Sequence, residues 1–126
     1  MAKDQLFRNI FKIGGFRQSF KVAVRGIIYL FIYHRNMRII FMLGFAALLL
    51  GFLFKLKGIE LVALCITVTM VFMAEIFNTA VELMMNTITE KYHTRILLIK
   101  DIAAAIVVLT CLNALAVGYA LFITKL

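Results

Sequence analysis

Three long uncharged stretches make up most of the chain, and short charged segments separate them. They cover residues 39–54, 61–74 and 102–124, and the second stays mostly apolar through Met85. A helix needs about 20 residues to cross the hydrocarbon core of a membrane, and about 17–25 are tolerated. The third stretch is long enough by itself, whereas the first must include residues on its flanks. The pattern therefore predicts three transmembrane helices.

The segment ahead of the first span has an amphipathic pattern instead. Basic residues recur there at intervals of four with apolar residues between them, at Arg8 and Lys12 and again at Arg17, Lys21 and Arg25. A helix of this kind lies in the headgroup plane of a membrane, with its cations toward anionic lipid. We expect the glycine pair at 14–15 to divide it into two pieces. The expected organisation is a single domain, in which residues 1–36 form an amphipathic interfacial segment and residues 37–126 form the spans.

Composition agrees with this pattern. Of the 126 residues, 64% are apolar and 16% are charged. A soluble domain usually carries about 45–50% apolar and about 25% charged residues, so the surplus exceeds what one small core can bury. A secreted disulfide scaffold, a disordered regulator and a soluble two-domain enzyme are thereby excluded, and no disulfide framework follows from two cysteines within apolar stretches. The predicted fold class is an all-α membrane protein with an N-terminal surface helix and three transmembrane helices.

The basic residues are distributed unevenly around the spans. Eight lysines and arginines precede the first span and three lie between the second and third, whereas two lie between the first and second and one at the C-terminus. The positive-inside tendency therefore places the N-terminus and the loop around residues 91–100 in the cytoplasm, where nucleotides are available. A net charge of +8 would also suit a nucleic-acid partner, but the sequence has no nucleic-acid motif, and this placement explains the charge.

Four polar residues interrupt the second span, namely Glu75, Asn78, Glu82 and Asn86. At 100° per residue they fall within an arc of about 80°, so they share one helix face. An intramembrane carboxylate costs about 2.5–3.5 kcal/mol, so we expect a cation, a proton or a partner helix to compensate it. Oxygen ligands suit Mg²⁺, which takes one or two carboxylates together with water and substrate phosphates. A helix-packing seam with protonated glutamates is the alternative.

Further polar residues follow the stripe. A helix over residues 61–89 would be about 43 Å long, longer than the hydrocarbon core, so its end must rise into the cytoplasmic interface. Glu90, Tyr92 and His93 come just beyond it, and Lys100 and Asp101 open the third span. We expect the acids, the amides and the Lys100–Asp101 pair to converge where a lipid headgroup meets water.

These residues resemble the signature of the prokaryotic diacylglycerol kinase family. The similarity rests on the segment Ala-Glu-Ile-Phe-Asn-Thr-Ala-Val-Glu at 74–82, then Tyr92-His93, then Lys100-Asp101, and it extends over essentially the whole chain. The Arg35-Asn36 pair with a nearby Arg38 is most like the undecaprenol kinase branch of Gram-positive bacteria.

The resemblance implies a homotrimeric kinase of the bacterial plasma membrane, with active sites shared between subunits. It would transfer the γ-phosphoryl group of ATP, with Mg²⁺, to a membrane lipid alcohol, most simply undecaprenol. Glu75 matches the catalytic base, and Asn78 and Glu82 match positions at the metal. The nucleotide would be bound by Asn78, Glu82, Asn86, Glu90, Tyr92, His93, Lys100, Asp101 and Arg17.

Three other functions stay open at this point. The lipid substrate could be diacylglycerol, with phosphatidic acid as product. A small proton-coupled transporter would use the buried carboxylates as proton carriers. A membrane scaffold without catalysis is suggested by Ile28, His34 and Asn86, which stand where the family commonly has acids.

Overall fold

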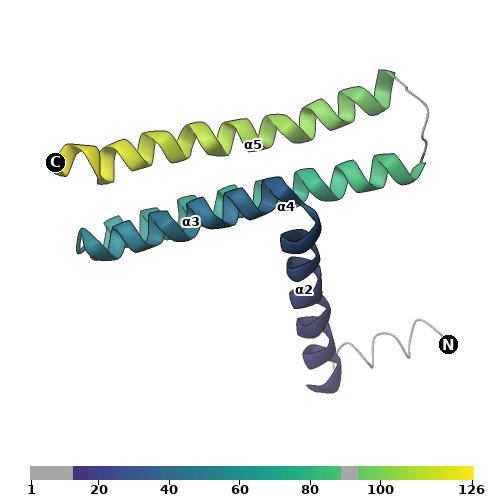
Figure 1. Cartoon of the computed structure of the whole chain (residues 1–126), viewed down its shortest axis with the longest axis horizontal. Coiled ribbons are helices and arrows are strands. Elements are labelled where there is room, and N and C mark those ends of the chain that lie inside the picture. Colours follow the sequence, from purple (N-terminus) through teal and green to yellow (C-terminus); the bar gives the residue numbers. More distant parts are fainter. Residues whose placement is uncertain (1–12, 89–93) are drawn as a thin grey trace. The chain divides into compact units, whose positions relative to one another are not determined.

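The computed structural model describes residues 13–88 and 94–126, and every regular element in these residues is helical. There are four α-helices in this part of the chain, followed by a short 3₁₀ helix (Figure 1): α2 (Ile13–Tyr33), α3 (Arg35–Leu53), α4 (Ile59–Ile88), α5 (Thr94–Leu121) and η1 (Ile123–Lys125). The all-α fold class is confirmed. The chain forms two compact units, residues 1–38 and residues 39–126.

In the first unit, α2 is the amphipathic helix that the sequence predicts. It runs without interruption from Ile13 to Tyr33, and its side chains are almost all exposed, apolar ones such as Phe16 and Phe20 included. His34 lies outside the helix, and the Arg38 guanidinium donates a hydrogen bond of 2.9 Å to the Ile32 carbonyl, which holds the turn together. The break expected at the glycine pair 14–15 was wrong, because both glycines lie within the first turn of the continuous helix α2; the piece expected ahead of them lies outside the described residues.

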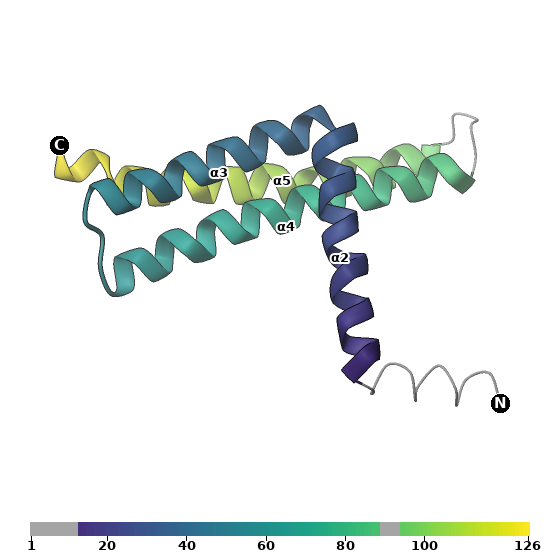
Figure 2. The same ribbon diagram turned by 60° about the horizontal axis from the view of Figure 1, so that its bottom comes forward.

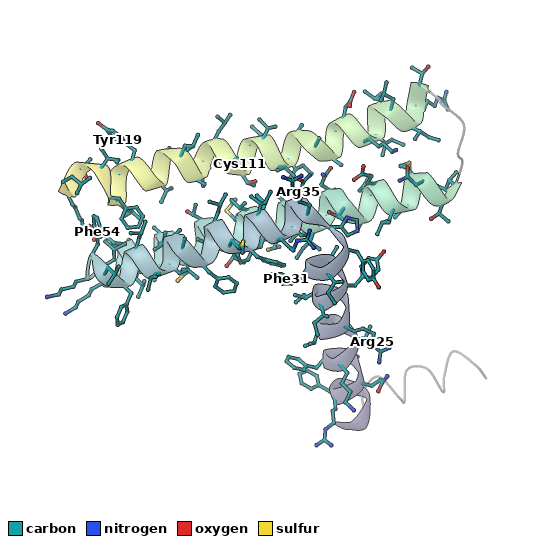
Figure 3. All side chains as sticks on the ribbon, viewed as in Figure 1. Arg25, Phe31, Arg35, Phe54, Cys111 and Tyr119 are labelled. Atoms are coloured by element: carbon teal, nitrogen blue, oxygen red, sulfur yellow. The ribbon has the colours of Figure 1, made fainter. Side chains whose placement is uncertain are left out.

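In the second unit, α3, α4 and α5 run alongside one another, as both ribbon views show (Figure 2). Within residues 13–88 and 94–126, three stretches are long and apolar enough to cross a membrane, namely Arg35–Leu53, Ile59–Ile88 and Thr94–Lys125, which agrees with the predicted number of spans. Apolar side chains cover the outside of these helices; Tyr119, for example, projects from α5 away from α4 (Figure 3). Such a surface is suited to contact with lipid.

The turn between α3 and α4 ends the first span. The amide of Leu56 donates to the Gly51 carbonyl at 3.0 Å, and the amide of Lys55 donates to the Phe52 carbonyl at 3.1 Å, with Lys55 in the left-handed region at φ 58°. These bonds form a Schellman motif, which satisfies the free carbonyls of a helix end. The chain can therefore reverse direction within the few residues between α3 and α4.

The core of this unit lies at the same end of the helices. Leu56, Leu64, Val68 and Leu121 are buried together, and the rings of Phe54 and Phe122 meet edge to face at 5.1 Å. Lys125 and Glu60 form an ion pair beside them at 2.5 Å. Residues 75–86 of α4 extend beyond this core, and they carry the predicted polar stripe.

Candidate active site

The four polar residues of the stripe all lie on one continuous helix, α4. Their spacing therefore places them on one face, over about 16 Å of helix length. Their exposure increases along the helix: Glu75 is 6% exposed, Asn78 is half-buried, and Glu82 and Asn86 are exposed. A gradient of this kind is expected where a helix rises from an apolar interior toward an interface.

Glu75 is buried together with two small residues of the same helix. Ala74 and Thr79 are buried with it, and the Thr79 hydroxyl donates a hydrogen bond of 2.9 Å to the Glu75 backbone carbonyl. This bond to a carbonyl four residues earlier is common for threonine in helices. Sequence reasoning did not single out Thr79, although its position four residues after Glu75 was a usable signal.

The other end of the stripe contacts α5. The Lys100 ammonium donates a hydrogen bond of 2.7 Å to the Asn86 side-chain carbonyl. Asn86 lies in the last turn of α4, and Lys100 is the seventh residue of α5, so the bond joins two consecutive spans close to their connection. An uncharged acceptor orients the lysine and leaves its positive charge available for an anion.

The remaining predicted residues are less closely grouped. Glu82 and Asp101 are exposed on α4 and α5, and Arg17 is exposed on α2, within the first unit. The structure therefore brings Asn86 and Lys100 into contact and places the stripe on one face. The predicted Glu90, Tyr92 and His93 lie outside the described residues.

The donor set fits Mg²⁺ bound together with phosphates. Asn78 and Glu82 offer one amide oxygen and one carboxylate on successive turns of α4, which are hard donors of the kind that this ion prefers. Among residues 13–88 and 94–126, no three His, Cys, Asp or Glu side chains are grouped as a metal site would require.

The fold and the stripe define a class, a helical membrane protein with an acid and amide site at one end of its spans. The sequence assigns it to a family within that class. Residues 21–122 match the model of the family described as "Prokaryotic diacylglycerol kinase", and the chain belongs to this family. It is a membrane lipid kinase, and membership implies that it uses ATP.

Two characterised relatives are similar over most of the chain. A diacylglycerol kinase of Synechocystis sp. is 32% identical over 127 aligned residues, which cover 99% of this chain and 73% of the relative. An undecaprenol kinase of Bacillus subtilis is 31% identical over 115 residues, which cover 91% of this chain and 94% of the relative. The two identities are too similar to distinguish between the two substrates.

Proposed function

We propose that this kinase phosphorylates undecaprenol, or another polyprenol, to its monophosphate and releases ADP. The observation that carries the proposal is the order of burial along one face of α4. The buried Glu75 carboxylate comes first, and the exposed Asn86, bonded to Lys100, comes last. A lipid alcohol can approach the buried end from the membrane, while a water-soluble triphosphate approaches the exposed end.

Glu75 acts as the general base in this proposal. Its carboxylate accepts the proton of the lipid hydroxyl, and the hydroxyl oxygen forms a bond to the γ-phosphorus of ATP. The bond from that phosphorus to the bridging oxygen breaks, and ADP leaves with the electron pair. A base must lie about 2.6–3.2 Å from the hydroxyl that it deprotonates, which requires the alcohol to reach the depth of Glu75.

The rest of the stripe would bind the nucleotide. Asn78 and Glu82 would hold Mg²⁺, which neutralises phosphate charge when it is bound. Lys100, oriented by Asn86, would contact the phosphates, with Asp101 next to it. The family resemblance assigns further nucleotide contacts to four residues, namely Glu90, Tyr92, His93 and Arg17.

Two observations favour a polyprenol over diacylglycerol. The undecaprenol kinase of B. subtilis is matched over 94% of its length, compared with 73% for the diacylglycerol kinase of Synechocystis. The Arg35-Asn36 pair with Arg38 resembles the undecaprenol kinase branch. Diacylglycerol remains the second candidate because that relative is the more identical of the two.

We further propose a homotrimer with active sites shared between subunits, oriented with the N-terminus and the α4–α5 connection in the cytoplasm. The orientation is supported by the uneven distribution of basic residues. The trimer is inferred from family resemblance. A trimer would also explain why one chain leaves the exposed side of the site open.

The test is phosphoryl transfer by the purified protein. The protein would be incubated in lipid nanodiscs with Mg²⁺, ATP labelled at the γ-position and, in parallel, undecaprenol, a short prenol or diacylglycerol. We expect label chiefly in undecaprenyl monophosphate. Label chiefly in phosphatidic acid would assign diacylglycerol instead, and no label in any lipid would contradict the proposal.

A further inference from the structure

A cavity of about 310 Å³ lies between α3, α4 and α5, within the second unit. Small residues on α3 and α5 leave room for it, including Ala47, Ala114 and Gly118. A Cβ atom added to Gly118 would have no neighbour within 4 Å, so the space beside this glycine is open. We call this space the interhelical cavity.

The lining of the interhelical cavity is almost wholly apolar. Of its described lining residues, Thr67 and Cys111 have polar side chains. The Thr67 hydroxyl already donates to the Ala63 carbonyl at 2.7 Å, and a thiol is only a weak donor. A polar metabolite would therefore find few partners here, whereas a hydrocarbon chain would need none.

The interhelical cavity continues the face of α4 that carries the polar stripe. Its lining residues Leu64, Val68 and Val71 precede Glu75 by 11, 7 and 4 positions. At 100° per residue they fall at 340°, 20° and 320° from Glu75, inside the arc of about 80° that holds the stripe. Val71 lies about 6 Å along the helix from Glu75. One helix face is thus polar toward its C-terminal end and borders a cavity toward its N-terminal end.

The position of the cavity across the membrane is informative. The charged Glu60 and Lys125 pair at one end of the spans, and such charges mark an interface. A hydrocarbon core of about 30 Å corresponds to about 20 residues of helix, so it would extend along α4 from about residue 60 to about residue 80. The midplane then falls near residue 70, and Glu75 lies about halfway between the midplane and the opposite interface. The cavity residues 64–72 of α4 lie around the midplane and beyond it.

We propose that the interhelical cavity binds the hydrocarbon chain of the lipid alcohol around the bilayer midplane, so that the enzyme favours an alcohol whose chain is long enough to fill the cavity. The inference rests on the proposed function, because it places the hydroxyl at Glu75. The cavity residues of α4 lie about 5–17 Å along the helix from Glu75, so a very short chain ends before most of the cavity, whereas a longer chain continues through it. The cavity has about twice the volume of the roughly 150 Å³ site that binds benzene, which is room for about a dozen carbon atoms.

The test fills the cavity and compares substrates of different chain length. Ala114→Leu adds three carbon atoms to the lining, and Ala116→Leu makes the same change at an exposed position of the same helix. We expect Ala114→Leu to lower kcat/KM for undecaprenol about threefold to tenfold, because the larger side chain takes the place of methylene groups that pack against the lining, and to leave 3-methyl-2-butenol, a single isoprene unit too short to enter far into the cavity, unchanged. Ala116→Leu should change neither value. Equal effects on both substrates, or on neither, would overturn the inference.

A binding measurement separates this inference from the proposed function. An undecaprenol analogue with a diazirine on the third isoprene unit from its hydroxyl would be photolysed on the wild-type protein, and the labelled residues mapped by mass spectrometry. Labelling of cavity residues, reduced in Ala114→Leu, supports the inference even if the protein phosphorylates no polyprenol. Labelling spread over the lipid-facing surface overturns the inference. Absence of label from the cavity, because a second copy of the chain fills it, also overturns the inference.

Discussion

Glu75, the buried glutamate of α4, differs in its surroundings from Glu60 and Glu82. It is 6% exposed, whereas Glu82 is exposed on the same helix face and Glu60 is half-buried beside Lys125. The two stripe glutamates therefore suit different tasks. A buried carboxylate can meet a lipid hydroxyl, and an exposed one can meet a hydrated ion.

The contact between Lys100 and Asn86 leads to a first prediction. Asn86→Ala removes the acceptor that orients the ammonium, so we expect the KM for ATP to rise about threefold to tenfold with little change in kcat, as loss of a partly exposed hydrogen bond to a charged group would cause. Thr87→Ala is the matched control, because the Thr87 hydroxyl only bonds the Leu83 carbonyl. Steady-state kinetics with varied ATP would check this, and an equal rise in both variants would count against a specific role for Asn86.

The assignment of the metal ligands leads to a second prediction. Glu82→Gln keeps the shape of the side chain and removes its charge, so about tenfold more Mg²⁺ should be needed for half-maximal activity. Glu60 pairs with Lys125 at the other end of the spans, so Glu60→Gln should leave the required Mg²⁺ concentration unchanged. Titration of activity with Mg²⁺ at saturating ATP measures the Mg²⁺ concentration that gives half-maximal activity. An unchanged Mg²⁺ requirement in Glu82→Gln would remove Glu82 from the metal site.

The helices themselves were predictable because hydropathy and length decide membrane spans. The uncharged run beginning at residue 39 belongs to α3, which begins earlier, at Arg35, because a helix extends through charged residues when they reach the interface. Likewise α4 begins at Ile59, ahead of the run at 61–74. Helix periodicity also placed the four stripe residues on one face correctly.

Individual contacts between helices could not be read from that pattern. We expected the amides to converge with the Lys100–Asp101 pair, and Asn86 does contact Lys100, but which amide makes the contact depends on how α4 and α5 pack. The interhelical cavity depends on small residues from two helices meeting a third, which a one-dimensional pattern does not reveal. Periodicity identifies which residues share one helix face, whereas helix packing determines which residues of other helices contact that face.

Close packing of α3 on α4 leads to a prediction for these elements. A Cβ atom at Gly51 would lie 2.4 Å from Leu64, which is itself buried in the core. Gly51→Val should therefore force the two helices apart and lower the free energy of unfolding by about 1–3 kcal/mol, as overpacking does. Thermal unfolding in detergent would detect the loss. Gly26→Val is the control, because a Cβ atom at Gly26 has no neighbour within 4 Å; equal losses in the two variants would contradict the packing argument.

At the scale of the whole molecule, the basic residues predict its orientation in the membrane. In a chain with Cys65→Ala and Cys111→Ala, a single cysteine at Lys57 should react with a membrane-impermeant maleimide from outside intact cells. A single cysteine at Thr94 should react only after the cells are opened. Both positions are exposed, so access to them depends on the side of the membrane. The reverse labelling pattern would invert the proposed topology and place the stripe away from cellular ATP.

The proposed placement of the stripe near the inner face would explain how the two substrates meet. A membrane-bound alcohol and a soluble nucleotide have to meet where the hydrocarbon ends, and α4, 30 residues long, reaches beyond a core of about 30 Å. In our proposal, its buried and exposed acids serve the two substrates from one helix. An enzyme with three spans per chain gains the remainder of its site, in our proposal, from neighbouring subunits.

The most direct test of this account is phosphoryl transfer from labelled ATP to undecaprenol by Glu75→Gln, compared with Glu60→Gln and with the unaltered chain. Loss of a general base should slow turnover by about 10²–10⁴-fold, while MgATP still raises the thermal stability of the variant as it does that of the unaltered chain. Glu60→Gln should retain its activity, because an exposed ion pair contributes little. Turnover by Glu75→Gln at the rate of the unaltered chain would contradict the account.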